Sequence, residues 1–177
     1  MDTDPLETFA AWWAEEQVPL VLATATLAGE PSARAVVLED FDHRGFVFWT
    51  SAESRSGREL AANPLAALVF LWERRRQFRV EGRVERVSDE ENEAHWAKRE
   101  GKREIAAFRQ DEPIDDRAAL EELVRRTPET PPRPKFWVGY RVVPDAIETW
   151  IAHGDFVHDR FRYAREGDGW RCTRLQP

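Results

Sequence analysis

The sequence predicts a mainly β protein with flanking helices, in which five or more antiparallel strands close into a barrel. Short apolar runs recur along the 177 residues and are typical of strands, most clearly at residues 65–72 and 77–87. Short polar connections separate these runs, which favours antiparallel neighbours. A closed barrel would also leave no exposed strand edge.

The first element is a helix that we expect to cover one end of the barrel. Asp4 is a plausible N-cap, Pro5 suits the first helical position, and Glu7 follows the cap by three residues. An apolar face then runs to about Gln17. The residues of this face are Leu6, Phe9, Trp12 and Trp13.

The next elements are strands. Residues 19–26 predict a buried strand, and Ala28 and Gly29 predict the turn after it. Apolar residues at 35–38 and at 46–49 then predict two further strands, joined by a polar turn at residues 42–45.

A short helix after the second of these strands predicts an anion site. Ser54 is a good N-cap, so the backbone N–H groups of the first turn lie at the positive end of the helix dipole. Arg55, Ser56 and Arg58 add two guanidinium groups and a hydroxyl there, which suits a terminal phosphate. The alternative is a capped surface helix with two solvated arginines.

The second half of the chain predicts helices and then strands. Ser88 and Glu91 form a capping box at the start of a helical region that extends to about residue 109 and breaks near Gly101. A further helix covers about 116–126 and ends at the proline-rich residues 127–134. Four strands are expected at 136–143, 146–152, 160–165 and 169–175, with a hairpin turn at 166–169. No linker divides the chain, so we expect one domain over residues 1–177.

Composition excludes several classes of function. A net charge of −7 and a pI near 5.2 argue against a nucleic-acid binder. Cys172 is the single cysteine, so no intramolecular disulfide can form, and the histidines share no metal-ligand spacing, so no metal is expected. No apolar run approaches the roughly 20 residues that span a bilayer, and no signal pattern opens the chain. We therefore expect a cytoplasmic protein that does not bind membranes.

Two groups of motifs occur in the chain. The first, within residues 34–64, consists of RAVVL, FVFWTS, SRSGREL and NP, and the second consists of Trp150, HDRFRY at 158–163 and the closing GWRCTRLQP. The first group resembles the flavin-binding core of the pyridoxamine 5'-phosphate oxidase family and its phenazine-biosynthesis relatives, and the second resembles the family's C-terminal segment. The likeness runs from about Leu20 to Pro177. The resemblance implies a homodimeric split β-barrel that binds FMN at the subunit interface. Residues from about 136 to 177 would then complete the dimer and the cofactor site.

The resemblance also implies which residues bind the cofactor. The positions that match a strand beside the isoalloxazine and ribityl chain are Arg34, Val36, Val37 and Leu38. Trp49 stands where the family usually has tyrosine, Thr50 matches, and Arg55 matches a phosphate-binding arginine. Ser56 replaces a lysine, for which Arg58 could substitute. Gln77 matches a ring-contacting glutamine, and Trp150 and Arg160 match contacts from the partner subunit.

The implied substrate positions depart from the family. Glu39 replaces a lysine, His95 a tyrosine and Arg103 a serine, while Arg99 is retained. An Arg-x-His unit reads Phe156, Val157, His158, and a Gln-Ser pair would fall at Glu112 and Pro113. Glu39 would repel a phosphate, so we expect a changed substrate.

Two features near these positions leave alternatives open. His158 is the candidate catalytic residue, with its imidazole facing substrate. Alternatively, His158 only forms a hydrogen bond within a turn. The basic residues Lys98, Arg99, Lys102 and Arg103 are expected on one helical face, where they bind an anion or form a solvated, salt-bridged surface.

The activity that follows from the resemblance is an FMN-dependent oxidase. A small cyclic or aromatic molecule, such as a phenazine precursor, would give a hydride to the flavin, and O2 would reoxidise it. One alternative is a true pyridoxine or pyridoxamine 5'-phosphate oxidase. Another is a non-catalytic protein that binds flavin or deazaflavin.

Overall fold

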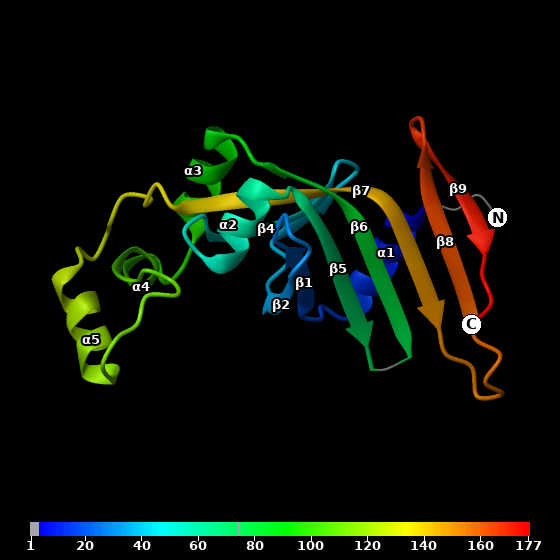
Figure 1. Cartoon of the computed structure of the whole chain (residues 1–177), viewed down its shortest axis with the longest axis horizontal. Coiled ribbons are helices and arrows are strands. Elements are labelled where there is room, and N and C mark those ends of the chain that lie inside the picture. The colour runs from blue at the N-terminus through cyan, green and yellow to red at the C-terminus, as the bar shows by residue number, and fades with distance from the viewer. Residues whose placement is uncertain (1–3, 74) are drawn as a thin grey trace.

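The computed structural model describes residues 4–73 and 75–177, and it consists of a sheet of nine strands with helices around it (Figure 1). The helices are α1 Pro5–Glu15, α2 Arg55–Ala62, α3 Asp89–Lys98, α4 Lys102–Ala107 and α5 Arg117–Arg126. The strands are β1 Leu20–Ala25, β2 Pro31–Val36, β3 Asp40–Asp42, β4 Gly45–Ser51, β5 Leu65–Trp72, β6 Arg76–Arg86, β7 Trp137–Ile151, β8 Asp159–Glu166 and β9 Gly169–Arg174. The predicted class, mainly β with flanking helices, is confirmed.

The sheet is antiparallel and wraps around α1. Its order is β2-β1-β5-β6-β7-β4-β3, with β8 and β9 continuing from β7. Phe9 of α1 is fully buried, and its ring centre lies 4.8–5.0 Å from those of Phe41, Phe46, Phe70 and Phe78. These four rings come from four different strands, so the sheet must curve around the helix to bring them together.

The barrel is not closed by hydrogen bonds. The strand path starts at β2 and ends at β3, and within the described ranges no ladder joins these two strands. The prediction of complete closure is therefore wrong. A set of antiparallel strands does not by itself fix whether the two end strands meet.

The pairing around residues 34–50 also differs from the prediction. The strand that ends at Val36 pairs with β1 across the Gly29 turn, where the backbone φ is +84°. The hairpin partner of β4 is instead the short β3, and Asp42 accepts hydrogen bonds from the backbone and side chain of Arg44 in the turn between them. Val37 and Leu38 thus lie between strands.

One long strand replaces two predicted ones. β7 has 15 residues and continues through Pro144, where we expected a turn. Pro144 lies opposite Gly82 of β6 at a register shift, where a residue without an N–H group is tolerated. Residues 137–142 pair with β4 and residues 146–151 with β8, while β6 pairs along both halves.

The predicted helix ends are confirmed. Asp4, Ser54, Ser88 and Asp116 are the N-caps of α1, α2, α3 and α5, and Ser88 forms its capping box with Glu91. Gly101, with a φ of +66°, separates α3 from α4, so residues 98–103 are not on one helix face as expected. α4 and α5 lie beyond the sheet, near the start of β7 (Figure 1). None of the described helices is long and apolar enough to cross a membrane.

Gly82→Ala should destabilise the protein, because a Cβ at this position would overlap the Val143 carbonyl of β7. We expect a loss of about 1–3 kcal/mol in the free energy of unfolding, measured by urea titration. Gly154→Ala is the matched control, because its Cβ would have no neighbour within 4 Å. Equal stability of the two variants would contradict the close approach of β6 and β7.

Candidate functional site

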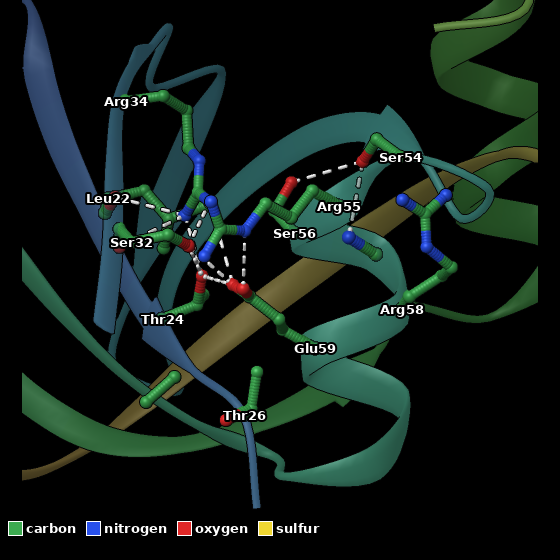
Figure 2. Close-up of polar contacts among 12 residues, drawn as sticks. Leu22, Thr24, Thr26, Ser32, Arg34, Ser54, Arg55, Ser56, Arg58 and Glu59 are labelled. Atoms are coloured by element: carbon green, nitrogen blue, oxygen red, sulfur yellow. Dashed lines mark hydrogen bonds and ion pairs between the residues drawn. The ribbon is translucent and has the colours of Figure 1, made fainter. Parts of the chain in front are cut away.

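A buried carboxylate connects α2 to the first two strands of the sheet (Figure 2). We call Thr24, Ser32, Arg34, Arg55 and Glu59 the Glu59 cluster. Glu59 Oε2 accepts hydrogen bonds from Thr24 Oγ1 at 2.5 Å and Ser32 Oγ at 2.6 Å, and Oε1 accepts one from Arg55 Nε at 2.8 Å. Arg34 Nη1 and Nη2 donate to the same two hydroxyls at 2.6 Å and 2.5 Å. The cluster therefore joins β1, β2 and α2.

The Glu59 carboxylate is ionised at neutral pH. Hydrogen bonds from Ser32 and Thr24, followed by that of Arg55, lower the pKa of Glu59 from 4.5 to about 2, against the opposing effect of burial. The side chain is only 5% exposed. Arg34 Nη2 lies 3.6 Å from Glu59 Oε2, so this one negative charge faces two guanidinium groups.

The N-terminus of α2, where the sequence predicts a phosphate site, contacts a carboxylate of the same chain. Ser54 caps the helix by accepting a hydrogen bond from the Gly57 N–H at 3.1 Å. The Arg55 N–H donates to Asp111 Oδ2 at 2.5 Å, and Arg58 lies 3.7 Å from the same carboxylate. A carboxylate from a distant loop thus occupies the position where the dipole and donors favour negative charge.

Sequence reasoning missed two residues at this helix end. Gln110 Oε1 lies 3.4 Å from Thr50 Oγ1, and Asp111, with a φ of +72°, contacts α2. Glu112 and Pro113, at which the resemblance placed a Gln-Ser pair, are exposed. The signal was the Gln-Asp dipeptide two residues earlier, but its distance from α2 depends on the conformation of the intervening loop.

A second group of predicted residues lies on three neighbouring strands. Gln77 of β6 pairs with Trp150 of β7, which pairs with Arg160 of β8. The three residues line a cavity of about 270 Å³. Arg160 is held by the buried Glu148, which accepts from its Nε at 2.9 Å and its Nη2 at 3.2 Å and raises its pKa. Within the described part of the chain, no hydrogen bond or ion pair joins this group to the Glu59 cluster.

His158 lies beside Trp150, at 4.8 Å between ring centres. Its Nδ1 accepts a hydrogen bond from the backbone N–H of His153 at 3.1 Å, so the neutral ring carries its proton on Nε2. The turn hydrogen bond is therefore present, and it orients the ring with Nε2 as the remaining donor. Phe156 is 83% exposed and Val157 is 66% exposed in the same loop.

Three of the predicted substrate residues come together. Arg99 Nη1 donates to Glu39 Oε1 at 2.7 Å, and His95 Nε2 lies 3.6 Å from the other carboxylate oxygen. His95 stacks on Trp49 at 3.8 Å with an interplanar angle of 7°, and burial, the largest effect, lowers the pKa of its imidazole. Glu39, His95 and Trp49 line a cavity of about 320 Å³.

The structure places the remaining predicted residues away from this cavity. Arg103 donates to the carbonyls of Thr127 and Arg125 at 2.8 Å and 2.9 Å, at the C-terminal end of α5, because the break at Gly101 redirects the chain. Leu38 is 7% exposed and belongs to the core, whereas Val37 is 66% exposed. Arg58 points away from the Glu59 cluster (Figure 2).

Comparison with known proteins identifies the family. The family model of pyridoxamine 5'-phosphate oxidase matches residues 6–129. The chain belongs to this family. A second model, described as the pyridoxine 5'-phosphate oxidase C-terminal dimerisation region, matches residues 137–177. Together the two matches cover both groups of residues described above.

Several members of the pyridoxamine 5'-phosphate oxidase family are similar over nearly the whole chain. Proteins named pyridoxine/pyridoxamine 5'-phosphate oxidase from Rubrobacter xylanophilus and Gluconobacter oxydans are 49% and 44% identical, over 99% and 100% of this chain and 88% and 96% of theirs. The structure of PhzG from Burkholderia lata, in complex with tetrahydrophenazine-1-carboxylic acid, superposes with a TM-score of 0.90 at 34% identity, covering 98% of this chain and 93% of that one. An FMN-binding protein from Nostoc punctiforme, 19% identical with a TM-score of 0.83, covers 100% of both chains and shares the fold.

The stability of this family member should depend on the ionisation of Glu59. Because the folded pKa of Glu59 lies below its ordinary value, its contribution is complete above about pH 4.5 and is lost as the pH falls towards 2. We expect a loss of about 2 kcal/mol between pH 5 and pH 3 from this group. Urea unfolding of Glu59→Gln should show a shallower pH dependence by that amount, whereas a slope equal to that of the wild type would contradict the prediction.

Proposed function

We propose that the protein is an FMN-dependent oxidase that takes a hydride from a small cyclic or aromatic donor and passes electrons to O2. Membership of the pyridoxamine 5'-phosphate oxidase family supports the reaction class. The ion pair between Arg99 and Glu39 at 2.7 Å supports a changed substrate. Arg99 gives its terminal Nη1 to Glu39, and the Glu39 side chain is 22% exposed and lines the cavity, so this carboxylate would repel a phosphate ester there.

The residues at the α2 N-terminus fit a flavin phosphate. The Arg55 N–H donates to the Asp111 carboxylate, so a phosphate would displace Asp111 and take over the same kind of contact at the helix end. Arg55, Ser56 and Arg58 would hold the phosphate, with Arg55 at the first position of the helix, and Arg34 and Thr50 would lie beside them. Val36 and Val37 would lie along the ribityl chain and ring.

A second subunit would complete the site. Gln77, Trp150 and Arg160 form one group on adjacent strands, separate from the Glu59 cluster within the chain. The match of residues 137–177 to a dimerisation region supports a homodimer in which this group contacts the flavin bound by the partner. Bound FMN supplies the hydride acceptor, and the protein positions the donor against it.

The cavity beside Trp49 would hold the substrate. The stacked rings of Trp49 and His95 provide a flat wall that suits an aromatic or cyclic molecule. Glu39 supplies a polar edge to this cavity and is paired with Arg99 behind it. His158 would donate its Nε2 proton to a substrate oxygen or nitrogen from the loop that also carries the exposed Phe156.

The second candidate is oxidation of pyridoxine or pyridoxamine 5'-phosphate. The names of the relatives from Rubrobacter xylanophilus and Gluconobacter oxydans favour it. The tetrahydrophenazine-1-carboxylic acid bound to PhzG favours the first candidate. Both candidates use the same cofactor and differ in the charge that the substrate presents to Glu39.

A direct assay separates these candidates. The purified protein should release FMN, identified by chromatography and absorbance, rather than a deazaflavin. With O2 as acceptor, it should oxidise tetrahydrophenazine-1-carboxylic acid with a kcat/KM at least about 100 times that for pyridoxine 5'-phosphate. A preference for pyridoxine 5'-phosphate would establish the second candidate. FMN that is not reduced by either substrate would indicate a non-catalytic flavin protein.

Glu39→Gln should improve the binding of pyridoxine 5'-phosphate, the weaker of the two substrates. Loss of the carboxylate frees Arg99 and removes a negative charge, so we expect the KM for pyridoxine 5'-phosphate to fall about tenfold. Asp40→Asn is the control, because it removes one charge from the same cavity without a contact to Arg99. An equal effect of both variants would show that bulk charge alone limits phosphate binding.

A further inference from the structure

We infer that Glu59 is a positioning residue for the cofactor phosphate, which it serves by fixing Arg55 with two of its donors facing the ligand. This inference rests on the proposed FMN site. Glu59 itself is 5% exposed and faces the sheet, whereas the Arg55 side chain is 57% exposed. A buried carboxylate thus holds the base of an arginine whose outer end is open to solvent.

Two positive charges lie close together at Glu59. Arg34 and Arg55 come from β2 and α2, and both guanidinium groups turn towards the Glu59 carboxylate (Figure 2). Arg55 Nε lies 2.8 Å from Oε1, and Arg34 Nη2 lies 3.6 Å from Oε2. Two like charges this close repel each other unless an opposite charge lies between them. Without Glu59, the more exposed Arg55 would move into solvent.

The two oxygens of the Glu59 carboxylate accept hydrogen bonds from different groups. Oε2 accepts from the hydroxyls of Thr24 and Ser32, and Oε1 accepts from Arg55. The hydroxyls in turn accept from Arg34, so their hydrogens are committed to Glu59. A glutamine has one acceptor oxygen and would present an NH2 group to one set of donors. An amide therefore cannot reproduce this arrangement.

The two arginines differ in how many of their guanidinium donors are used within the chain. Arg34 uses Nη1 and Nη2 for Thr24, Ser32 and the Leu22 carbonyl. Arg55 uses only Nε, and within the described residues its Nη1 and Nη2 make no hydrogen bond. Arg55 is therefore the arginine that meets the phosphate, with the paired N–H edge that suits phosphate oxygens. Arg34 adds positive charge near Arg55 without donating to the phosphate.

The experiment compares two flavins that differ only in the phosphate. Full-length protein freed of cofactor is titrated with FMN and with riboflavin, and binding is followed by quenching of flavin fluorescence. We expect Glu59→Gln to raise the Kd for FMN about tenfold and to change that for riboflavin less than about twofold. Equal weakening of both flavins would indicate a merely structural role and would overturn the inference.

Glu53→Gln is the matched control, because Glu53 lies just before α2 and pairs with Arg109 at 3.7 Å rather than with the cluster. If only net charge mattered, both variants would bind FMN more tightly, and that result would also overturn the inference. In an Arg55→Ala background, Glu59→Gln should weaken FMN no more than about twofold, because Arg55 is the residue that Glu59 positions.

A milder variant keeps the test decisive if Glu59→Gln does not fold. Ser32→Ala removes one hydroxyl that links Arg34 to Glu59 and should reduce the preference for FMN over riboflavin about threefold; an unchanged preference would overturn the inference. A wild-type protein with no preference for FMN would overturn the proposed phosphate site and this inference together. A preference that survives Glu59→Gln would overturn the inference alone.

Discussion

The structure depends on a change of neighbour along β7. Its first half pairs with β4 and its second half with β8, while β6 follows both halves across the bulge at Gly82 and Pro144. The first half leads to β4 and so to α2, which carries Arg55. The second half carries Glu148 and Trp150. One continuous strand therefore sets the distance between the two groups of site residues, and the bulge sets their relative orientation.

Each of these groups is organised by a buried glutamate. Glu59 and Glu148 are both 5% exposed, and each accepts hydrogen bonds from arginine. Burying an ion pair contributes little net stability, because desolvation of both charges offsets their attraction. The value of such pairs is geometric, since a carboxylate fixes the plane and direction of a guanidinium group. The Glu39–Arg99 pair makes the same kind of contact, but there the carboxylate keeps the arginine from binding a ligand.

Local features were predicted well because local rules decide them. Asp4, Ser54, Ser88 and Asp116 cap their helices through side chains two or three residues from the N–H groups they serve. Strand pairing was predicted less well, because β2 joins β1 rather than β4 for reasons that depend on the whole sheet. The same holds for Asp111, which reaches Arg55 across 56 residues of sequence. The resemblance predicts candidate residues in both groups, but the contacts of Glu59 could be found only in the structure.

The burial of Phe9 has a consequence for the order of folding. Its ring packs against Phe41, Phe46, Phe70 and Phe78, all of which lie later in the sequence. α1 is synthesised before β3 to β6, so Phe9 has these partners only after the four strands have been synthesised and paired. α1 must therefore dock after these later strands, and until then its phenylalanine and tryptophans are exposed to chaperones and to other nascent chains.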